Sequence, residues 1–168
     1  MKRFLLLILI VSFSVSASEQ AITQYVYNTL ERAQANLDKG NIEAAEQIYY
    51  DNANYAWSSR SYDHFVILRT YAYFLISYDR NEEALKYLKQ ASLKRDMPPY
   101  DMFELNFTLG QVYYVNGDRE NAKKTLLKWV AIGEKNDLDL KPEGYAILAT
   151  IYAQDEEWGN ALKFITLA

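Results

Sequence analysis

The stretch LGQVYYVNGDRENAKKTL, residues Leu109–Leu126, contains two amphipathic segments joined by an Asn-Gly turn. Gly110 lies inside the first segment, although glycine in a helix costs about 1 kcal/mol relative to alanine. This indicates that a side chain at residue 110 would collide with a neighbouring element. The nearest candidate is the second segment, folded back as a helical hairpin so that Gly110 and Ala122 form one close contact.

Small residues recur at an almost constant interval on both sides of this hairpin. Intervals of 39, 38 and 39 residues separate those in the middle of four apolar segments, and the same intervals separate those that open the following segments. The first series is Ala33, Ala72, Gly110 and Ala149, and the second is Ala45, Ala84, Ala122 and Ala161. Two independent series with one period predict a helical hairpin repeated four times.

Glycine and proline are few and lie between the periodic segments, and almost nothing alternates as a strand would. The hairpins are therefore expected at about 22–58, 61–94, 100–135 and 142–168. Their helices are expected at 22–38, 42–58, 61–78, 81–94, 100–116, 119–135, 142–154 and 157–168.

The first 17 residues, MKRFLLLILIVSFSVSA, have the layout of a cleavable secretory signal. Two basic residues precede an apolar core, and small residues occur at Val15 and Ala17 before Ser18. The core is shorter than the ~20 residues that a membrane span needs. We expect residues 1–17 to be removed, leaving one helical-repeat domain at 18–168. An uncleaved membrane anchor is the alternative.

The charge balance restricts the classes of partner. The chain has 18 Lys and Arg against 22 Asp and Glu, and loss of Lys2 and Arg3 with the signal takes the net charge from −4 to −6. Nucleic acid and anionic membranes require grouped basic residues, and the nearest group is the pair Lys123 and Lys124. We therefore expect no nucleic-acid partner and no direct membrane insertion after cleavage. Since there is no cysteine, stability must come from packing without disulfides.

The repeat pattern resembles the tetratricopeptide repeat (TPR) family. The third unit carries the pattern in Leu109-Gly110, Tyr113, Asn116-Gly117-Asp118, Ala122 and Leu126, and the fourth in Leu148-Ala149, Tyr152, Trp158, Ala161 and Ile165. The resemblance covers about Ile22 to Ala168, with Asn36 in place of the usual aromatic residue in the first unit. It implies an all-α fold, a right-handed superhelix of four hairpins, with a period about one helical turn longer than usual.

Two shorter strings, Leu127-Lys128-Trp129 and Pro142-Glu143-Gly144-Tyr145, resemble periplasmic TPR proteins that accompany a second TonB-ExbB-ExbD energy-transduction system in Gram-negative bacteria. This resemblance implies a periplasmic adaptor of a TonB-type transport complex. The alternatives are an assembly or chaperone factor for another envelope machine, and a structural segment of a longer repeat scaffold. Because that group carries further repeats, a further alternative is that this chain is a truncated form of a longer array.

The sequence contains no pattern typical of catalysis. His64 is the single histidine and there is no cysteine, which excludes a two-histidine metal motif and a thiol nucleophile. His64 is expected to be a surface or helix-packing residue. The acidic clusters at 137–139 and 155–157 fall at helix boundaries, where carboxylates interact favourably with the next helix N-terminus. We expect a non-catalytic protein with no metal and no cofactor.

A stack of hairpins curves, and the first helix of each pair lines the concave face. In the TPR family this face holds a peptide or a partner helix, through residues three before and one or four after the central small residue. The peptide-binding groove is expected to contain Gln34, Arg69, Tyr73, Phe107, Gln111 and Tyr114. Packing of Tyr73 and Phe107 between neighbouring units is the alternative. No row of Lys and Asn is present, so a terminal carboxylate ligand is not favoured.

The last segment is expected to expose apolar surface. One apolar stripe at helical spacing, which the preceding helix can cover, consists of Trp158, Ala161, Leu162, Ile165 and Ala168. Phe164 and Leu167 lie beside it, where a further repeat would pack. Because repeat arrays usually end in a polar cap, this end is expected to be covered by self-association, by the partner or by further chain.

Overall fold

The computed structural model describes residues 20–58 and 61–168, and regular secondary structure in these residues is entirely helical. The helices are α1 (Gln24–Asp38), α2 (Ile42–Ala53), α3 (Tyr62–Ser77), α4 (Asn81–Ser92), α5 (Pro99–Val115), α6 (Arg119–Asn136), α7 (Pro142–Gln154) and α8 (Trp158–Ile165). The predicted all-helical class is confirmed. The predicted signal sequence, residues 1–17, lies outside the described residues. None of the helices in the described ranges is both long and apolar enough to cross a membrane.

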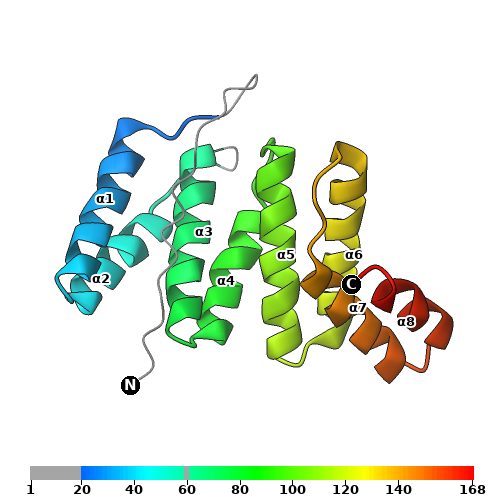
Figure 1. Cartoon of the computed structure of the whole chain (residues 1–168). Coiled ribbons are helices and arrows are strands. Elements are labelled where there is room, and N and C mark those ends of the chain that lie inside the picture. The colour runs from blue at the N-terminus through cyan, green and yellow to red at the C-terminus, as the bar shows by residue number, and fades with distance from the viewer. Residues whose placement is uncertain (1–19, 59–60) are drawn as a thin grey trace.

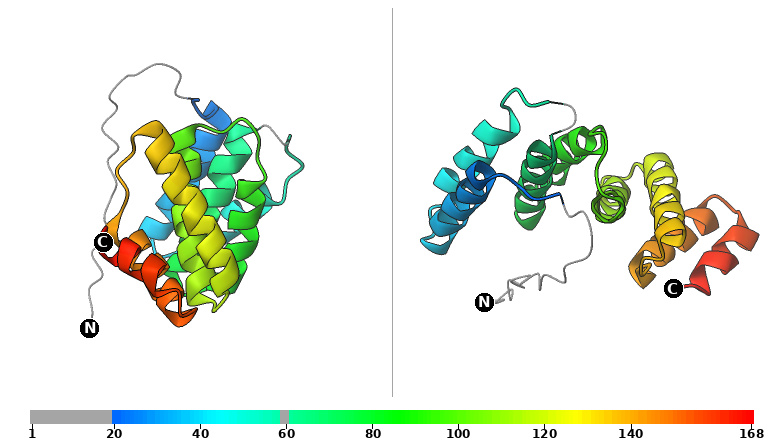
Figure 2. Two further views of the ribbon diagram at one scale, coloured as in Figure 1. Left: turned by 90° about the vertical axis from the view of Figure 1, so that its right-hand side faces the viewer. Right: turned by 90° about the horizontal axis from the view of Figure 1, so that it is seen from above.

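The helices pair in chain order as four hairpins that stack side by side (Figure 1). The second helix of each hairpin packs on the first helix of the next, α2 on α3, α4 on α5 and α6 on α7. The first helices α1, α3, α5 and α7 lie along one side of the array (Figure 2), and α1 contacts α3 as α5 contacts α7. All four hairpins contribute one helix to this side (Figure 2).

Gly110 marks the closest approach in the third hairpin. A Cβ atom at this position would lie 2.6 Å from Cγ of Leu126 and 2.7 Å from its Cδ2, a separation that forces an atom to move. Leu126 is fully buried, so its side chain has no free space to occupy. The nearest atoms therefore belong to Leu126, one turn after the Ala122 expected from the sequence. All eight small residues of the two series are buried.

Two apolar clusters form the core, and α5 contributes to both. One face of α5, including Leu105 and Leu109, joins the cluster built from the first two hairpins. Another face, through Phe103 and Phe107, packs around the fully buried Trp129 in the second cluster. The array has no single centre, because each helix pair buries its apolar surface against its neighbours.

The helix ends follow from capping and proline geometry. The Thr23 side chain caps α1, Ser61 caps α3 and Asp118 caps α6, each accepting a hydrogen bond from a backbone N–H of the first turn. Pro99 and Pro142 begin α5 and α7, positions where the missing N–H of proline leaves no unsatisfied acceptor.

Helix α2 ends earlier than expected. The sequence predicted a helix over 42–58, whereas α2 stops at Ala53. The Trp57 indole N–H donates to the Asn52 carbonyl at 2.9 Å, and the Ala53 carbonyl accepts from Nε2 of His64 at 2.9 Å. These side chains take the carbonyls that a further turn would use.

The assignment of buried residues in the last helix was wrong. Phe164, expected at the exposed edge, is buried, whereas Trp158, Leu162 and Ile165 are 66%, 65% and 55% exposed. The Phe164 ring lies parallel to the Tyr152 ring, with centroids 5.5 Å apart and planes 4° apart. This aromatic contact turns α8 about its axis, so that Ala161 and Phe164 face the core while Trp158, Leu162 and Ile165 of the expected stripe face solvent.

The Gly110 contact predicts a specific loss of stability. Gly110→Leu and Ala122→Leu should each lower the free energy of unfolding by ~1–3 kcal/mol or more, because added methylenes have no space in a packed interior. Lys124→Leu, at an exposed position of the same helix α6, is the matched control. Urea denaturation of the three variants measures the effect, and equal stability would contradict the close packing of this hairpin.

Candidate functional site

The candidate site is the outward surface of α1, α3, α5 and α7, here called the first-helix face. Its residues lie three before and one and four after each central small residue. They are Leu30, Gln34, Leu37, Arg69, Tyr73, Ile76, Phe107, Gln111, Tyr114, Ala146, Thr150 and Ala153. Gln34, Tyr73 and Thr150 are exposed, Phe107 is buried, and the others are half-buried. The face is therefore accessible over all four hairpins.

Three residues of the central two hairpins offer uncommitted polar groups. Tyr73 is 38% exposed, and its hydroxyl lies 3.4 Å from the Thr108 hydroxyl, too far for a strong hydrogen bond. Within the described residues, the Gln111 amide and the Tyr114 hydroxyl have no hydrogen-bond partner. Each of these groups can both donate and accept, which is the requirement for bonding to peptide N–H and C=O groups.

Arg69 is committed to the protein itself. Its Nη1 lies 2.5 Å from Oδ1 of the buried Asp101 on α5, and its guanidinium lies over the Phe65 ring at 5.2 Å. The Tyr62 hydroxyl donates to the other oxygen of Asp101 at 2.9 Å. Arg69 thus joins the second hairpin to the third, and its charge is neutralised before any ligand approaches.

Phe107 and Gln34 are also engaged within the chain. The Phe107 ring packs on the Trp129 ring at 5.2 Å between centroids, which is the packing role that the sequence left open. Lys141 places its ammonium 4.6 Å from the Phe107 ring and pairs with Glu104 at 2.8 Å. The Gln34 amide donates to Asp38 at 2.8 Å. Tyr73, Gln111 and Tyr114 are therefore the predicted residues best placed to contact a ligand.

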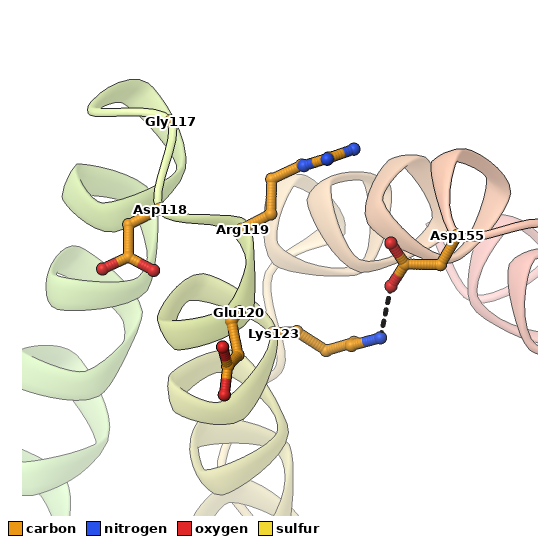
Figure 3. Close-up of a pocket in the computed structure, with 6 residues that line it drawn as sticks. All are labelled: Gly117, Asp118, Arg119, Glu120, Lys123 and Asp155. Carbon is orange, nitrogen blue, oxygen red and sulfur yellow. Dashed lines mark hydrogen bonds and ion pairs between the residues drawn. The ribbon is translucent and has the colours of Figure 1, made fainter.

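A surface pocket occurs away from this face, between the turns of the third and fourth hairpins (Figure 3). Gly117, Asp118, Arg119, Glu120, Lys123 and Asp155 line it. The Lys123 ammonium pairs with Asp155 and with Glu157 and lies 4.9 Å from the Tyr152 ring. Asp118 accepts from the Asn121 backbone N–H at 3.1 Å. The pairing of Lys123 with Asp155 and Glu157 therefore joins the third hairpin to the fourth beside this pocket.

His64 is only 8% exposed and is fixed on both ring nitrogens. Nε2 lies 2.9 Å from the Ala53 carbonyl and must carry a proton to donate to it. Nδ1 therefore accepts from the Lys94 ammonium, 2.7 Å away, and Lys94 also donates to the Ser58 carbonyl at 3.0 Å. Trp57 stacks on the imidazole at 5.7 Å between centroids. His64 thus holds the α2–α3 connection against α3 and α4.

Burial lowers the pKa of His64, the Ala53 hydrogen bond opposes this, and the Lys94 charge lowers it further. Burial also lowers the pKa of Lys94. The neutral imidazole, held between a carbonyl and an ammonium, has a structural role at this position. No group of three or more His, Asp or Glu side chains in residues 20–58 and 61–168 is arranged to hold a metal.

Asp101 and Val115 were not singled out from the sequence. Asp101 occupies the first turn of α5, where an acid is ordinary, but it lies 38 residues after Asp63, which accepts two hydrogen bonds from Thr23. The repeat period was therefore a signal for an inter-hairpin contact at both positions. Val115 is 68% exposed at the end of α5. It comes one residue after Tyr114, the last residue of α5 that was expected in the groove.

A scan of protein-family models gives no match to the chain, and neither does a search of curated proteins. Solved structures of the same architecture do match. The crystal structure of MamA aligns with a TM-score of 0.63 at 16% identity, over 84% of this chain and 74% of that chain. A putative kinesin light chain of Podosopora anserina with nearly identical TPR-like repeats aligns with a TM-score of 0.62 at 18% identity, over 83% and 71%. The chain therefore has a TPR-like fold.

The environment of His64 predicts a pH dependence of stability. Because its pKa is lowered on folding, the unfolded chain binds a proton first as the pH falls through the unfolded value of about 6.5. The contribution of neutral His64 to the free energy of unfolding is therefore fully present above that pH. Below it the free energy of unfolding decreases, with a slope of at most ~1.4 kcal/mol per pH unit. Urea denaturation between pH 5 and pH 7.5 measures this slope.

The variant His64→Gln supplies the control, since its amide can donate to the Ala53 carbonyl but does not titrate. Its free energy of unfolding should change little across the same range. As His64 is the single histidine, an unchanged slope in the variant would show that the dependence arises elsewhere.

Proposed function

We propose that this protein is a non-catalytic scaffold that binds another protein through its first-helix face. The observation that carries the proposal is the group formed by Tyr73, Gln111 and Tyr114, whose polar atoms are accessible and uncommitted. Tyrosine supplies a large contact area with few rotatable bonds and a hydroxyl that can donate or accept. The TPR-like fold supports the proposal, because stacked hairpins present an extended surface of this kind.

The partner that we propose is a component of a TonB-type energy-transduction complex, with the protein acting as an adaptor in the periplasm. The support is the resemblance in Leu127-Lys128-Trp129 and Pro142-Glu143-Gly144-Tyr145, together with the secretory pattern of residues 1–17. In the structure, Trp129 is the largest fully buried side chain and Gly144 lies against its ring. These strings therefore have a packing role as well, so the adaptor role requires a direct test.

Two other roles compete with the adaptor. An assembly or chaperone factor for another envelope machine would use the same face, with a different partner. A structural segment of a longer repeat scaffold would leave the face unoccupied. Intact mass of the protein from a periplasmic extract tests the location, since a mass that includes residues 1–17 would reject signal cleavage.

Self-association is a separate proposal. Exposure of Trp158, Leu162, Ile165 and Leu167 on or next to α8 supports it, because clustered apolar surface of this kind marks contact sites. Light scattering over a range of concentrations tests it. Trp158→Ser with Leu162→Ser should reduce any association, and a protein that stays monomeric at all concentrations would reject the proposal.

Partner capture should depend on the exposed tyrosines. Tyr73→Ala and Tyr114→Ala should each weaken binding by up to ~2 kcal/mol if the two residues are anchors. The measurement is affinity capture from solubilised envelopes, with quantification of TonB, ExbB and ExbD. Tyr50→Ala, at an exposed tyrosine of α2, is the control and should leave capture unchanged. Full capture by a correctly folded double variant would exclude this face as the binding site.

A further inference from the structure

In the two central hairpins, the second helices carry more charged residues than the first helices. Helix α4 carries Glu82, Glu83, Lys86 and Lys89, and α6 carries Arg119, Glu120, Lys123, Lys124, Lys128, Glu134 and Lys135. The Asp, Glu, Lys and Arg residues of α3 and α5 are only Asp63, Arg69, Asp101 and Glu104. The two central first helices therefore remain almost uncharged although one side of each faces solvent.

Each of these four charges is bonded within the chain. Asp63 accepts from the backbone N–H and hydroxyl of Thr23, at 2.9 and 2.7 Å. Asp101 pairs with Arg69. Glu104 pairs with Lys141 at 2.8 Å. The α3–α5 part of the first-helix face thus presents no free charge among the described residues.

The side chains that this part of the face exposes are neutral. Tyr73, Thr108 and Gln111 offer hydroxyl and amide groups, and Ile76, Tyr114 and Val115 offer apolar surface. Hydroxyl and amide groups can satisfy the N–H and C=O of a peptide backbone without requiring a charge on the ligand. A charged ligand side chain would lose its water here with no counter-ion to compensate, which is strongly unfavourable.

We propose that the α3–α5 part of the first-helix face selects a peptide segment whose side chains are uncharged. This rests on the proposed function and specifies the chemical class of the partner. Side chains of α3 and α5 meet where the Tyr73 hydroxyl lies 3.4 Å from that of Thr108, so one extended segment can contact both helices. The net negative charge of the chain resides elsewhere and contributes little to this contact.

Panning of a random 12-residue peptide library displayed on phage against the immobilised protein tests the inference. Selected sequences should be depleted of Asp, Glu, Lys and Arg relative to the starting library. Their binding should be lost with Tyr73→Ala and Tyr114→Ala and retained with Tyr50→Ala. A selected peptide with one central residue changed to Glu or Lys should bind at least about tenfold more weakly, since that charge is left unpaired.

Two further measurements separate this inference from the proposed function. The Kd of a selected peptide, measured by fluorescence anisotropy, should change by less than about twofold between ~50 and ~500 mM NaCl, because screening acts on charges. Gln111→Lys should weaken binding of the same peptide and should favour peptides with an added Glu.

Two outcomes would overturn the inference and leave the scaffold function standing. One is selection of charged peptides that still depend on Tyr73 and Tyr114. The other is a Kd that rises more than about tenfold with salt. Selection of no peptide that depends on these tyrosines would remove the function of the face and the inference together.

Discussion

The structure depends on close packing within and between hairpins, and α5 is the element on which this constraint acts most strongly. It contacts the second hairpin through one face and Trp129 through another, while Leu126 of α6 occupies the space that a side chain at residue 110 would need. A single hairpin could not bury its apolar side alone. Stability is therefore shared between neighbours, and one surface of each first helix remains exposed.

Polar contacts fix how successive hairpins meet without providing most of the stabilisation. Asp101 accepts hydrogen bonds from Arg69 and Tyr62, and Glu104 accepts from Lys141. Partly exposed ion pairs such as Lys141–Glu104 contribute about 0–1 kcal/mol each. Their main effect is to define the register of the hairpins and to consume the charges of the first helices. With these charges bonded, the exposed surface of α3 and α5 stays neutral and contains Tyr73 and Tyr114.

Aromatic packing explains the parts of the structure that departed from expectation. Trp57 and His64, whose rings stack, take the Asn52 and Ala53 carbonyls at the end of α2, and Phe164 stacks on Tyr152 in the last hairpin. In both cases a contact between rings decides an outcome that the hydrophobic pattern of the sequence leaves open. Helical periodicity places Ile165 and Phe164 equally well, whereas ring geometry favours Phe164 in the interior.

The sequence by itself determined the repeat period, the helical class and the burial of the eight small residues, because these depend on spacing along the chain. It also identified the columns that hold Tyr73, Gln111 and Tyr114. Only the tertiary structure decided that Phe107 packs on Trp129, that Arg69 is held by Asp101 and that Trp158 faces solvent. These outcomes depend on contacts between residues more than twenty positions apart or on the rotation of a helix about its axis. Local periodicity fixes neither, since both are set by which side chains meet when the hairpins stack.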